Sequence, residues 1–297
     1  MSTVNDLSRI ETPAADRCRA RLVPYRGCVA RPDPTVSDDA SGGPSVTSKA
    51  LGILAAFTAQ QPRLTLSEIG RRTGLPLTTA HRLVGELVGW GALERDEAGR
   101  YRIGLRLWEV ASLAPRSPGL RERAMPFLED LYEVTHENVQ LAVRDGLEAV
   151  YVERISGRQA VSVVSRVGGR LPLHATGVGQ VLLAYAPAEV QDGVLAAQLK
   201  AFTKFTITEP RRLRQVLAEV RRTETAVCDQ HVELGSLSIA APVFGPPDGA
   251  AEISAGPSVV AALSVVVPSE GADRLALVPA VRAAARGISR RLTPPPL

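Results

Sequence analysis

The sequence has few cysteines and no long hydrophobic run, and these absences narrow the classes of protein to consider. Cys18, Cys28 and Cys228 are an odd number without CxxC spacing, so neither a disulfide framework nor a structural zinc site is indicated. No stretch approaches the roughly 18 uncharged apolar residues of a membrane-spanning helix. The N-terminus, MSTVNDLSRIE, lacks the basic flank and apolar run of a secretory signal. We therefore expect a cytoplasmic protein with reduced thiols.

Motifs of the common enzyme classes are also missing. The sequence contains no GxSxG, GxGxxG or GxxxxGK[ST], which argues against hydrolase, dinucleotide-binding and nucleotide-phosphate chemistry. His174, His231, Cys228 and Asp229 are residue types that could hold zinc or form a Cys/His nucleophilic pair. A hydrogen-bonded structural histidine and an inert cysteine are the commoner interpretation. We expect no catalytic residue, metal or cofactor, and keep a metal- or Cys/His-dependent enzyme as a remote alternative.

The length and composition allow two domains, and the charge does not identify a binding partner. A chain of 297 residues with 45% hydrophobic content can form a sizeable core in each of two units. The formal net charge of +4 fits a polyanionic partner without requiring one. Segments rich in Pro, Ser, Gly and Asp interrupt the patterns. We predict a disordered extension over residues 1–46, a linker region within 105–119, a tail over 293–297, and folded domains over 47–104 and 120–292.

Two short helices are predicted at the start of the first domain. TSKALGILAAFTAQ has apolar residues at helical spacing and should form a scaffold helix with Leu51 and Leu54 facing inward. In TLSEIGRRTG, Thr65 can cap a helix, and Glu68 three residues later completes a capping box. Gly74 suits the C-terminus of that helix.

A third helix and a hairpin carry the residues that we expect to contact DNA. Leu75-Pro76 forces a turn, and a helix then runs to about Gly89 with its apolar positions recurring from Ala80. The N-terminal end of this helix faces solvent, where a recognition helix meets base edges. ALERDEAGRYRIG predicts a two-stranded wing with Ile103 inward. The predicted DNA-binding residues are Leu77, Thr78, Thr79, His81 and Arg82 on the helix and Arg95 and Arg100 on the wing.

The chemistry of these side chains suits contact with a DNA groove. Arg82 offers a donor fork for guanine or a phosphate, threonine hydroxyls can contact either, and Leu77 can meet a thymine methyl group. The alternative is a protein interaction module in which Arg71, Arg72 and Arg82 form a solvated face. The order of helices, turn and hairpin favours DNA binding.

The longer segment mixes strands and helices. Asp145-Gly146 is a strong hairpin turn within NVQLAVRDGLEAVYVERI. Further strands are expected in AVSVVS, SIAAPVF and ALSVVV. Helices are expected over 120–135, in TGVGQVLLAY, in EPRRLRQVLAEVRRT behind a Thr208 cap, and in ADRLALVPAVRAAARGISRRL. This order predicts one antiparallel sheet with helices packed on it, an α+β fold.

Two glycines stand where one of these helices begins, in LPLHATGVGQVLLA. Gly177 and Gly179 let backbone approach closely, and free N–H groups at a helix start favour a carboxylate or another anion. Close packing of the helix on the sheet explains the same glycines equally well.

In succession, these segments resemble the IclR family of bacterial transcription regulators over residues 47–291. The similar blocks, in family order, are SKALGILAAF, LSEIGRRTGLPLTTAHRLVGELVGWGALERD, GRYRIGLRLWEVAS, RLPLHATGVGQVLLA, the ELG of HVELGSLSIAAPVF, and AALSVVVP. The resemblance implies a winged helix-turn-helix domain, a linker helix near residues 105–114, a GAF-like α+β effector-binding domain, and assembly as dimers or tetramers. The long extension and the lengthened connection GPPDGAAEISAGPSVVA depart from the family pattern.

The same resemblance implies an effector pocket. Its carried-over positions are Leu171, Gly177, Val178, Cys228, Asp229, Ser236, Ser238, Ser264 and Val266. Many relatives have an acidic pair in place of Cys228-Asp229, so the identity of the effector does not transfer. We expect a homo-oligomeric repressor or activator that binds a palindromic double-stranded operator under the control of a small molecule, an organic acid or aromatic metabolite. In the alternative, the C-terminal domain only oligomerises.

Overall fold

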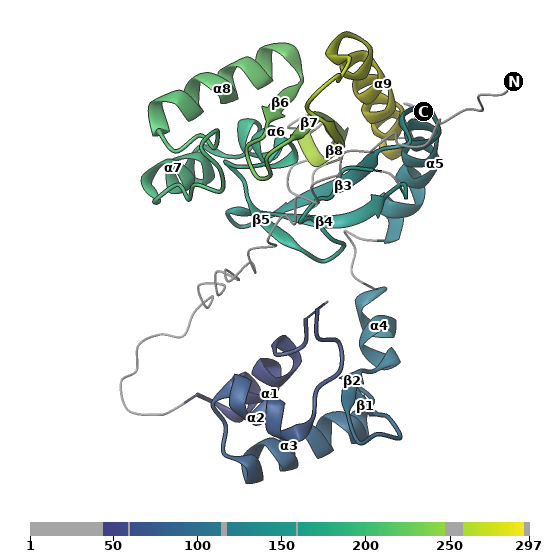
Figure 1. Cartoon of the computed structure of the whole chain (residues 1–297), viewed down its shortest axis with the longest axis vertical. Coiled ribbons are helices and arrows are strands. Elements are labelled where there is room, and N and C mark those ends of the chain that lie inside the picture. The colour runs from purple at the N-terminus through teal and green to yellow at the C-terminus, as the bar shows by residue number, and fades with distance from the viewer. Residues whose placement is uncertain (1–43, 59, 114–117, 159, 247–257, 294–297) are drawn as a thin grey trace, which may run out of the picture. The chain divides into compact units, whose positions relative to one another are not determined.

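The computed structural model describes residues 44–58, 60–113, 118–158, 160–246 and 258–293 (Figure 1). The predicted disordered extension lies almost wholly outside these residues, as do 114–117 of the predicted linker and 294–297 of the predicted tail. The described chain divides into two compact units. One contains the described residues up to Gly89 together with Arg95–Ile103, and the other contains Trp90–Glu94 and the residues from Gly104 onward. In the described part of the chain, no helix is long and apolar enough to cross a membrane.

Three helices and a hairpin form at the predicted places in the N-terminal part. The helices are α1 (Val46–Ala55), α2 (Leu66–Thr73) and α3 (Leu77–Trp90), and the hairpin pairs β1 (Leu93–Arg95) with β2 (Tyr101–Ile103). The capping box of Thr65 and Glu68 is present at the start of α2. Gly74 ends α2 with φ of 68°, a left-handed conformation that glycine adopts without strain. These local signals therefore confirm the predicted helix order and the hairpin.

Two expectations about the core of this region are wrong. Leu51, expected to face inward, is 60% exposed, while Ile53 on the same helix is fully buried. Nearly every residue of ALGILAAF is apolar, so periodicity alone cannot identify the buried face of α1. Ile103 is 43% exposed at the end of β2, whereas Tyr101 of the same strand is buried. In α3 the buried residues are Ala80, Leu83 and Val84, as the helical spacing predicted.

The second unit is built on one six-stranded sheet in the order β5-β4-β3-β8-β7-β6, and every neighbouring pair is antiparallel. Its strands are β3 (Asn138–Asp145), β4 (Glu148–Ile155), β5 (Arg170–Pro172), β6 (Ala226–Asp229), β7 (Ser236–Gly245) and β8 (Ser258–Pro268). Its helices are α4 (Leu105–Ala111), α5 (Pro118–Thr135), α6 (Gly177–Ala184), α7 (Ala188–Ala196), α8 (Pro210–Thr223) and α9 (Arg274–Leu292). The sheet confirms the predicted α+β class.

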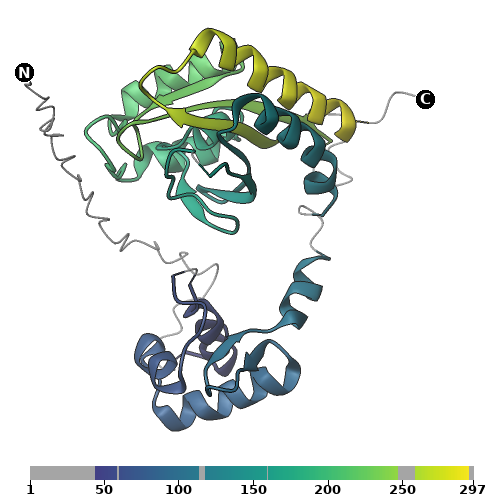
Figure 2. The same cartoon turned by 45° about the vertical axis from the view of Figure 1, so that its right-hand side comes forward.

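Helices cover both faces of this sheet (Figures 1 and 2). On one face α5 and α9 lie side by side and pack on β3, β7 and β8. On the other face α6 packs on β7 and β8, with α8 against its outer side. Side chains alternate along β8, so that Leu263 and Val265 face α5 and α9 while Ala262 faces α6. The candidate pocket described below lies on the α6 face.

Two predicted local features differ from the structure. The segment AVSVVS, residues 160–165, forms no strand. Its backbone carbonyl groups accept hydrogen bonds from side chains and not from a neighbouring strand. Asn138 donates to Val161 O at 2.7 Å, and Arg154 donates to Ser165 O at 2.7 Å. Helix α8 is preceded by Glu209 as its N-cap, without a side-chain capping bond, and Thr208 does not cap it.

Candidate functional site

The N-terminal half of α3 presents a row of exposed side chains. Leu77 is 53% exposed, Thr78, His81 and Arg82 are exposed, and Thr79 is half-buried. The opposite side of the helix is anchored by its buried residues, which hold this face outward. Four of the five helix residues predicted to contact DNA are exposed, and Thr79 is partly accessible beside them. Together they offer hydroxyl, imidazole, guanidinium and methyl groups for groove contacts.

Arg82 has a neighbour that the sequence reasoning missed. Its guanidinium forms an ion pair with the Glu86 carboxylate at 2.6 Å, one helical turn later, and both side chains are exposed. The i, i+4 spacing was the signal available in the sequence. An exposed pair of this kind contributes little to stability. Arg82 can therefore give up its ion pair with Glu86 and contact a phosphate or base with only a small loss of free energy.

The hairpin positions the two predicted wing arginines differently. Arg100 is exposed, and its backbone N–H donates to Asp96 Oδ1 at 2.9 Å, which closes the turn. Arg95 is exposed as well, with its guanidinium carbon 5.7 Å from the centre of the Tyr101 ring. This cation–π contact holds Arg95 against its own hairpin. Arg100 is thus the freer of the two for contact with an external anion.

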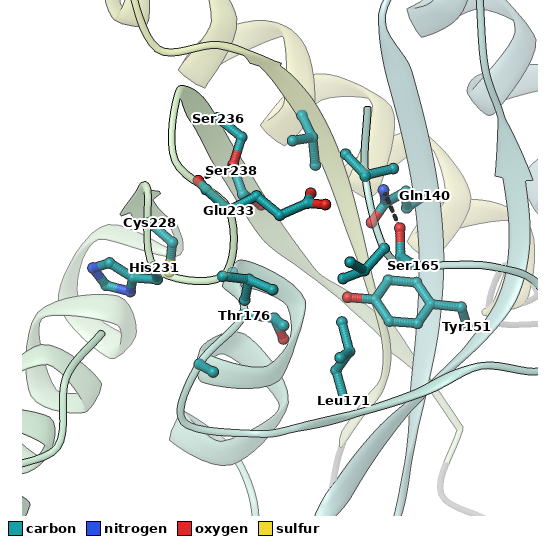
Figure 3. A pocket seen from close by; sticks show the side chains of 16 residues that line it. Gln140, Tyr151, Ser165, Leu171, Thr176, Cys228, His231, Glu233, Ser236 and Ser238 are labelled. Atoms are coloured by element: carbon teal, nitrogen blue, oxygen red, sulfur yellow. Dashed lines mark hydrogen bonds between the residues drawn. The ribbon is translucent and has the colours of Figure 1, made fainter. Parts of the chain in front are cut away.

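A pocket lies in the second unit between the start of α6, the strands β3, β7 and β8, and the segments before β5 and β7 (Figure 3). It offers about 50 Å³ to the centres of water molecules, enough for a few waters. Six of the predicted effector positions line it, namely Leu171, Gly177, Cys228, Ser236, Ser238 and Val266. The sequence reasoning missed the other lining residues, which are Gln140, Tyr151, Val163, Val164, Ser165, Ala175, Thr176, His231, Val232 and Glu233.

Three predicted positions do not line the pocket. Val178 is fully buried in the apolar core beneath α6. Asp229 follows Cys228 in a strand, so the two side chains point to opposite faces. Its carboxylate accepts hydrogen bonds from Ser269 and Arg274, each at 2.6 Å, and these bonds hold its pKa below the ordinary value. Ser264 is buried, and its hydroxyl has no hydrogen-bond partner among the described residues.

Close packing accounts for both glycines at the start of α6. A Cβ atom on Gly177 would lie 2.7 Å from Ser238 Oγ and 3.3 Å from Ala240 Cβ. One on Gly179 would lie 2.4 Å from the carbonyl oxygen of Leu173. The Thr176 side chain caps the helix by accepting from the Gly179 N–H at 3.0 Å. The helix therefore needs Gly177 in order to approach strand β7 and Gly179 in order to approach the segment that precedes the helix, whatever the pocket binds.

The polar lining of the pocket combines hydroxyl, amide, thiol and imidazole groups with the carboxyl group of Glu233. Among the residues that the structure describes, the lining includes no lysine or arginine. Burial raises the pKa of Glu233 to about 7, while the Val164 backbone amide and the Arg154 guanidinium act in the opposite direction. Burial also lowers the pKa of His231 and raises the pKa values of Tyr151 and Cys228. Tyr151 and Cys228 are therefore neutral near pH 7, and Glu233 is the ionisable acid of the site.

The candidate residues for zinc binding or nucleophilic catalysis, His174, His231, Cys228 and Asp229, are in other environments. His174 Nε2 lies 3.0 Å from the Lys200 carbonyl oxygen, and His231 Nδ1 lies 3.4 Å from the Gln180 amide nitrogen. Because burial raises its pKa, Cys228 keeps its proton, and the thiol is a poor nucleophile. Within the described ranges, no group of three or more His, Cys, Asp or Glu residues is arranged to hold a metal ion.

The raised pKa of Glu233 predicts a pH-dependent stability difference between the wild type and Glu233→Gln. A carboxyl that is harder to ionise in the folded state favours folding at low pH, and this contribution is lost as pH rises from 4.5 to about 7. Between about pH 5 and pH 8 the wild type should lose about 1–2 kcal/mol relative to the glutamine variant, after allowance for solvent screening. Urea unfolding of both proteins at the two pH values measures this difference. Parallel pH profiles would contradict the assignment.

Comparisons with known proteins agree with this architecture. The model of the IclR helix-turn-helix domain matches residues 46–97, and the model of the bacterial transcriptional regulator IclR C-terminal domain matches residues 114–290. The HTH-type transcriptional regulator KipR of Bacillus subtilis is 35% identical over 66% of this chain and 78% of its own length. The glycerol operon regulatory protein of Streptomyces coelicolor is 34% identical over 82% of this chain and 94% of its own.

A solved structure is similar across both units. It is an IclR homolog from Microbacterium hydrocarbonoxydans complexed with 4-hydroxybenzoate, with 38% identity, a TM-score of 0.76, and coverage of 84% of this chain and 99% of that chain. Relatives of this similarity and length, together with family models that match both parts of the sequence, confirm the predicted resemblance. The chain belongs to the IclR family of bacterial transcriptional regulators.

Proposed function

We propose that this regulator binds operator DNA through the exposed face of α3 and the β1–β2 hairpin, and that a small molecule in the α6-side pocket controls its affinity. The effector is an organic acid or an aromatic metabolite. The protein acts as a homodimer or homotetramer on a palindromic operator, since one winged helix contacts only a short half-site. The chain carries out no catalysis of its own.

The main support for binding of a small molecule is the pocket itself. Polar side chains from separate strands and loops meet in one partly enclosed space with apolar walls, an arrangement common to small-molecule sites. The space of about 50 Å³ has to widen to admit an aromatic ring. The structural relative with 4-hydroxybenzoate supports the same interpretation, because it is similar over nearly its whole length. That compound is therefore the first candidate to test.

Control of DNA binding requires that the effector distinguish two states of the protein. A ligand shifts an equilibrium only by its difference in affinity for the DNA-competent and the DNA-incompetent arrangements. Reciprocity then requires operator DNA to change the affinity for the ligand by the same factor. A typical coupling of about 1–3 kcal/mol corresponds to a roughly fivefold to 150-fold change.

Footprinting on the DNA upstream of the regulator's own gene should identify the operator, and calorimetry with 4-hydroxybenzoate and related metabolites should test the effector. An active compound should change operator affinity within the range given above.

Ser238→Ala should weaken binding of that compound by about fivefold to tenfold, because one hydrogen-bonding group is lost from the pocket wall. Ser112→Ala, at an exposed residue after α4, is the matched control and should bind normally. A protein that binds the operator but responds to no metabolite would favour the alternative of a C-terminal unit that only oligomerises.

A further inference from the structure

Glu233 is the one carboxylate that lines the α6-side pocket among the residues that the structure describes. Glu233 belongs to the segment between β6 and β7 and is half-buried. Its side chain passes beside Ser238 and directs its carboxyl group toward the side of the pocket where Gln140 lies (Figure 3). The sequence reasoning gave it no role. Its acid group is available to a molecule in the pocket, because the pocket wall includes it.

The groups around Glu233 leave its charge incompletely balanced. The Arg154 guanidinium, whose charge acts on Glu233, donates to Ser165 O at 2.7 Å and to Asn138 Oδ1 at 3.0 Å. Arg154 therefore acts on Glu233 as a nearby charge, and its two Nη groups are engaged with other acceptors. The remaining titratable groups of the lining, His231, Tyr151 and Cys228, are neutral near pH 7 because burial disfavours their charged forms.

The donors of the pocket are also partly used. Gln140 Nε2 donates to Ser165 Oγ at 2.8 Å, and the Ser236 hydroxyl donates to the backbone oxygen of Glu233 at 2.9 Å. The Glu233 carboxylate accepts from the Val164 backbone amide, and its remaining acceptor positions can take a donor that a ligand supplies. A hydrogen bond to a charged acceptor is stronger than one between neutral groups, whereas a second carboxylate at this place would be desolvated beside a like charge.

We propose that Glu233 is a specificity-determining residue of this pocket, which selects effectors that present a hydroxyl or amine donor to it and rejects effectors that present a carboxylate. The proposal rests on the proposed function, in which this pocket binds the effector. An organic acid fits with its acid group directed away from Glu233. A phenol or alcohol binds by donating its proton to the carboxylate oxygen in a hydrogen bond, without proton transfer.

Matched triplets of small ring compounds test this selection. Within each triplet the same ring carries a hydroxyl or aminomethyl group, a methyl group or a carboxylate, so only the group that meets Glu233 changes. Ligand-observed NMR on the full chain at pH 8, where Glu233 is ionised, should show donor compounds binding about tenfold tighter than methyl compounds, with carboxylates weakest. In Glu233→Gln the donor advantage should fall severalfold and the carboxylates should gain, because the amide offers N–H groups. Glu189→Gln, at an exposed carboxylate in the first turn of α7, is the control and should keep the wild-type order.

The outcomes separate this proposal from the proposed function. An order of affinities that is the same in the wild type and in Glu233→Gln overturns the role of Glu233 while the pocket remains an effector site. Binding in the expected order without any change in operator affinity supports the selection and overturns control of DNA by this pocket. Failure of every compound to bind the wild type overturns both.

Discussion

Replacing Arg82 with alanine should weaken operator binding by about tenfold to a hundredfold and leave the fold intact. Arg82 projects from the exposed end of α3, and among the described residues its guanidinium pairs with the exposed carboxylate of Glu86. Its removal therefore leaves no buried group unpaired, while a lost bidentate contact to a base costs about 1–3 kcal/mol. Gel-shift titration at fixed salt measures the effect.

Two further variants locate that effect. Arg211→Ala removes an exposed arginine from α8 and should leave operator affinity unchanged if the effect of Arg82→Ala is a direct contact and not a loss of net charge. Glu86→Gln removes the competing carboxylate and should leave operator binding equal or tighter. Equal affinities of the wild type and Arg82→Ala would remove Arg82 from the DNA interface.

The largest effect on stability is expected from Gly179→Ala. The new Cβ atom would lie 2.4 Å from the Leu173 carbonyl oxygen and 2.6 Å from Thr176 Oγ1, which caps α6. Neither atom can move without disturbing the helix start or the segment before it. We expect a loss of about 3 kcal/mol or more, and a fall in melting temperature of about 6–12 °C for a unit of this size.

Gly193→Ala is the matched control for this clash. Its Cβ atom would meet Leu147 Cδ2 at 3.6 Å, an ordinary contact, within helix α7. Alanine should therefore stabilise the protein by about 0.4–1 kcal/mol, the opposite sign to Gly179→Ala. Scanning calorimetry compares the two. An unchanged melting temperature for Gly179→Ala would show that α6 does not pack on the segment before it as described.

Some of the residues that line the pocket were predictable from the sequence, and others were not. Family blocks pointed to Ser236, Ser238 and Val266, which line it, and also to Asp229, whose carboxylate is bound elsewhere. Glu233 lies within one of these blocks and was missed. Ser236, three residues later, was among the predicted positions. The groups that act on the charge of Glu233, the Val164 backbone amide and the Arg154 guanidinium, come from segments far away along the chain.

The sequence by itself determined the features that depend on near neighbours. The capping box at Thr65, the left-handed Gly74 and the turn at Asp145-Gly146 each follow from a few adjacent residues. Alternation along the strands follows from a fixed period and needs no knowledge of the partner strand. The order of the helices and the α+β class were predictable for the same reason.

Only the tertiary structure decided what these elements bring together. Because β8 lies between β3 and β7, side chains of strands far apart in the sequence face one space beside α6. Residues 160–165 have a strand-like sequence, yet Asn138 and Arg154 bind their backbone and leave Val163 and Val164 against the pocket. Gly177 is required by the short distance from α6 to strand β7, and the charge of the pocket depends on how deeply Glu233 is buried. Distance and burial arise only when remote segments pack, so no local pattern could encode them.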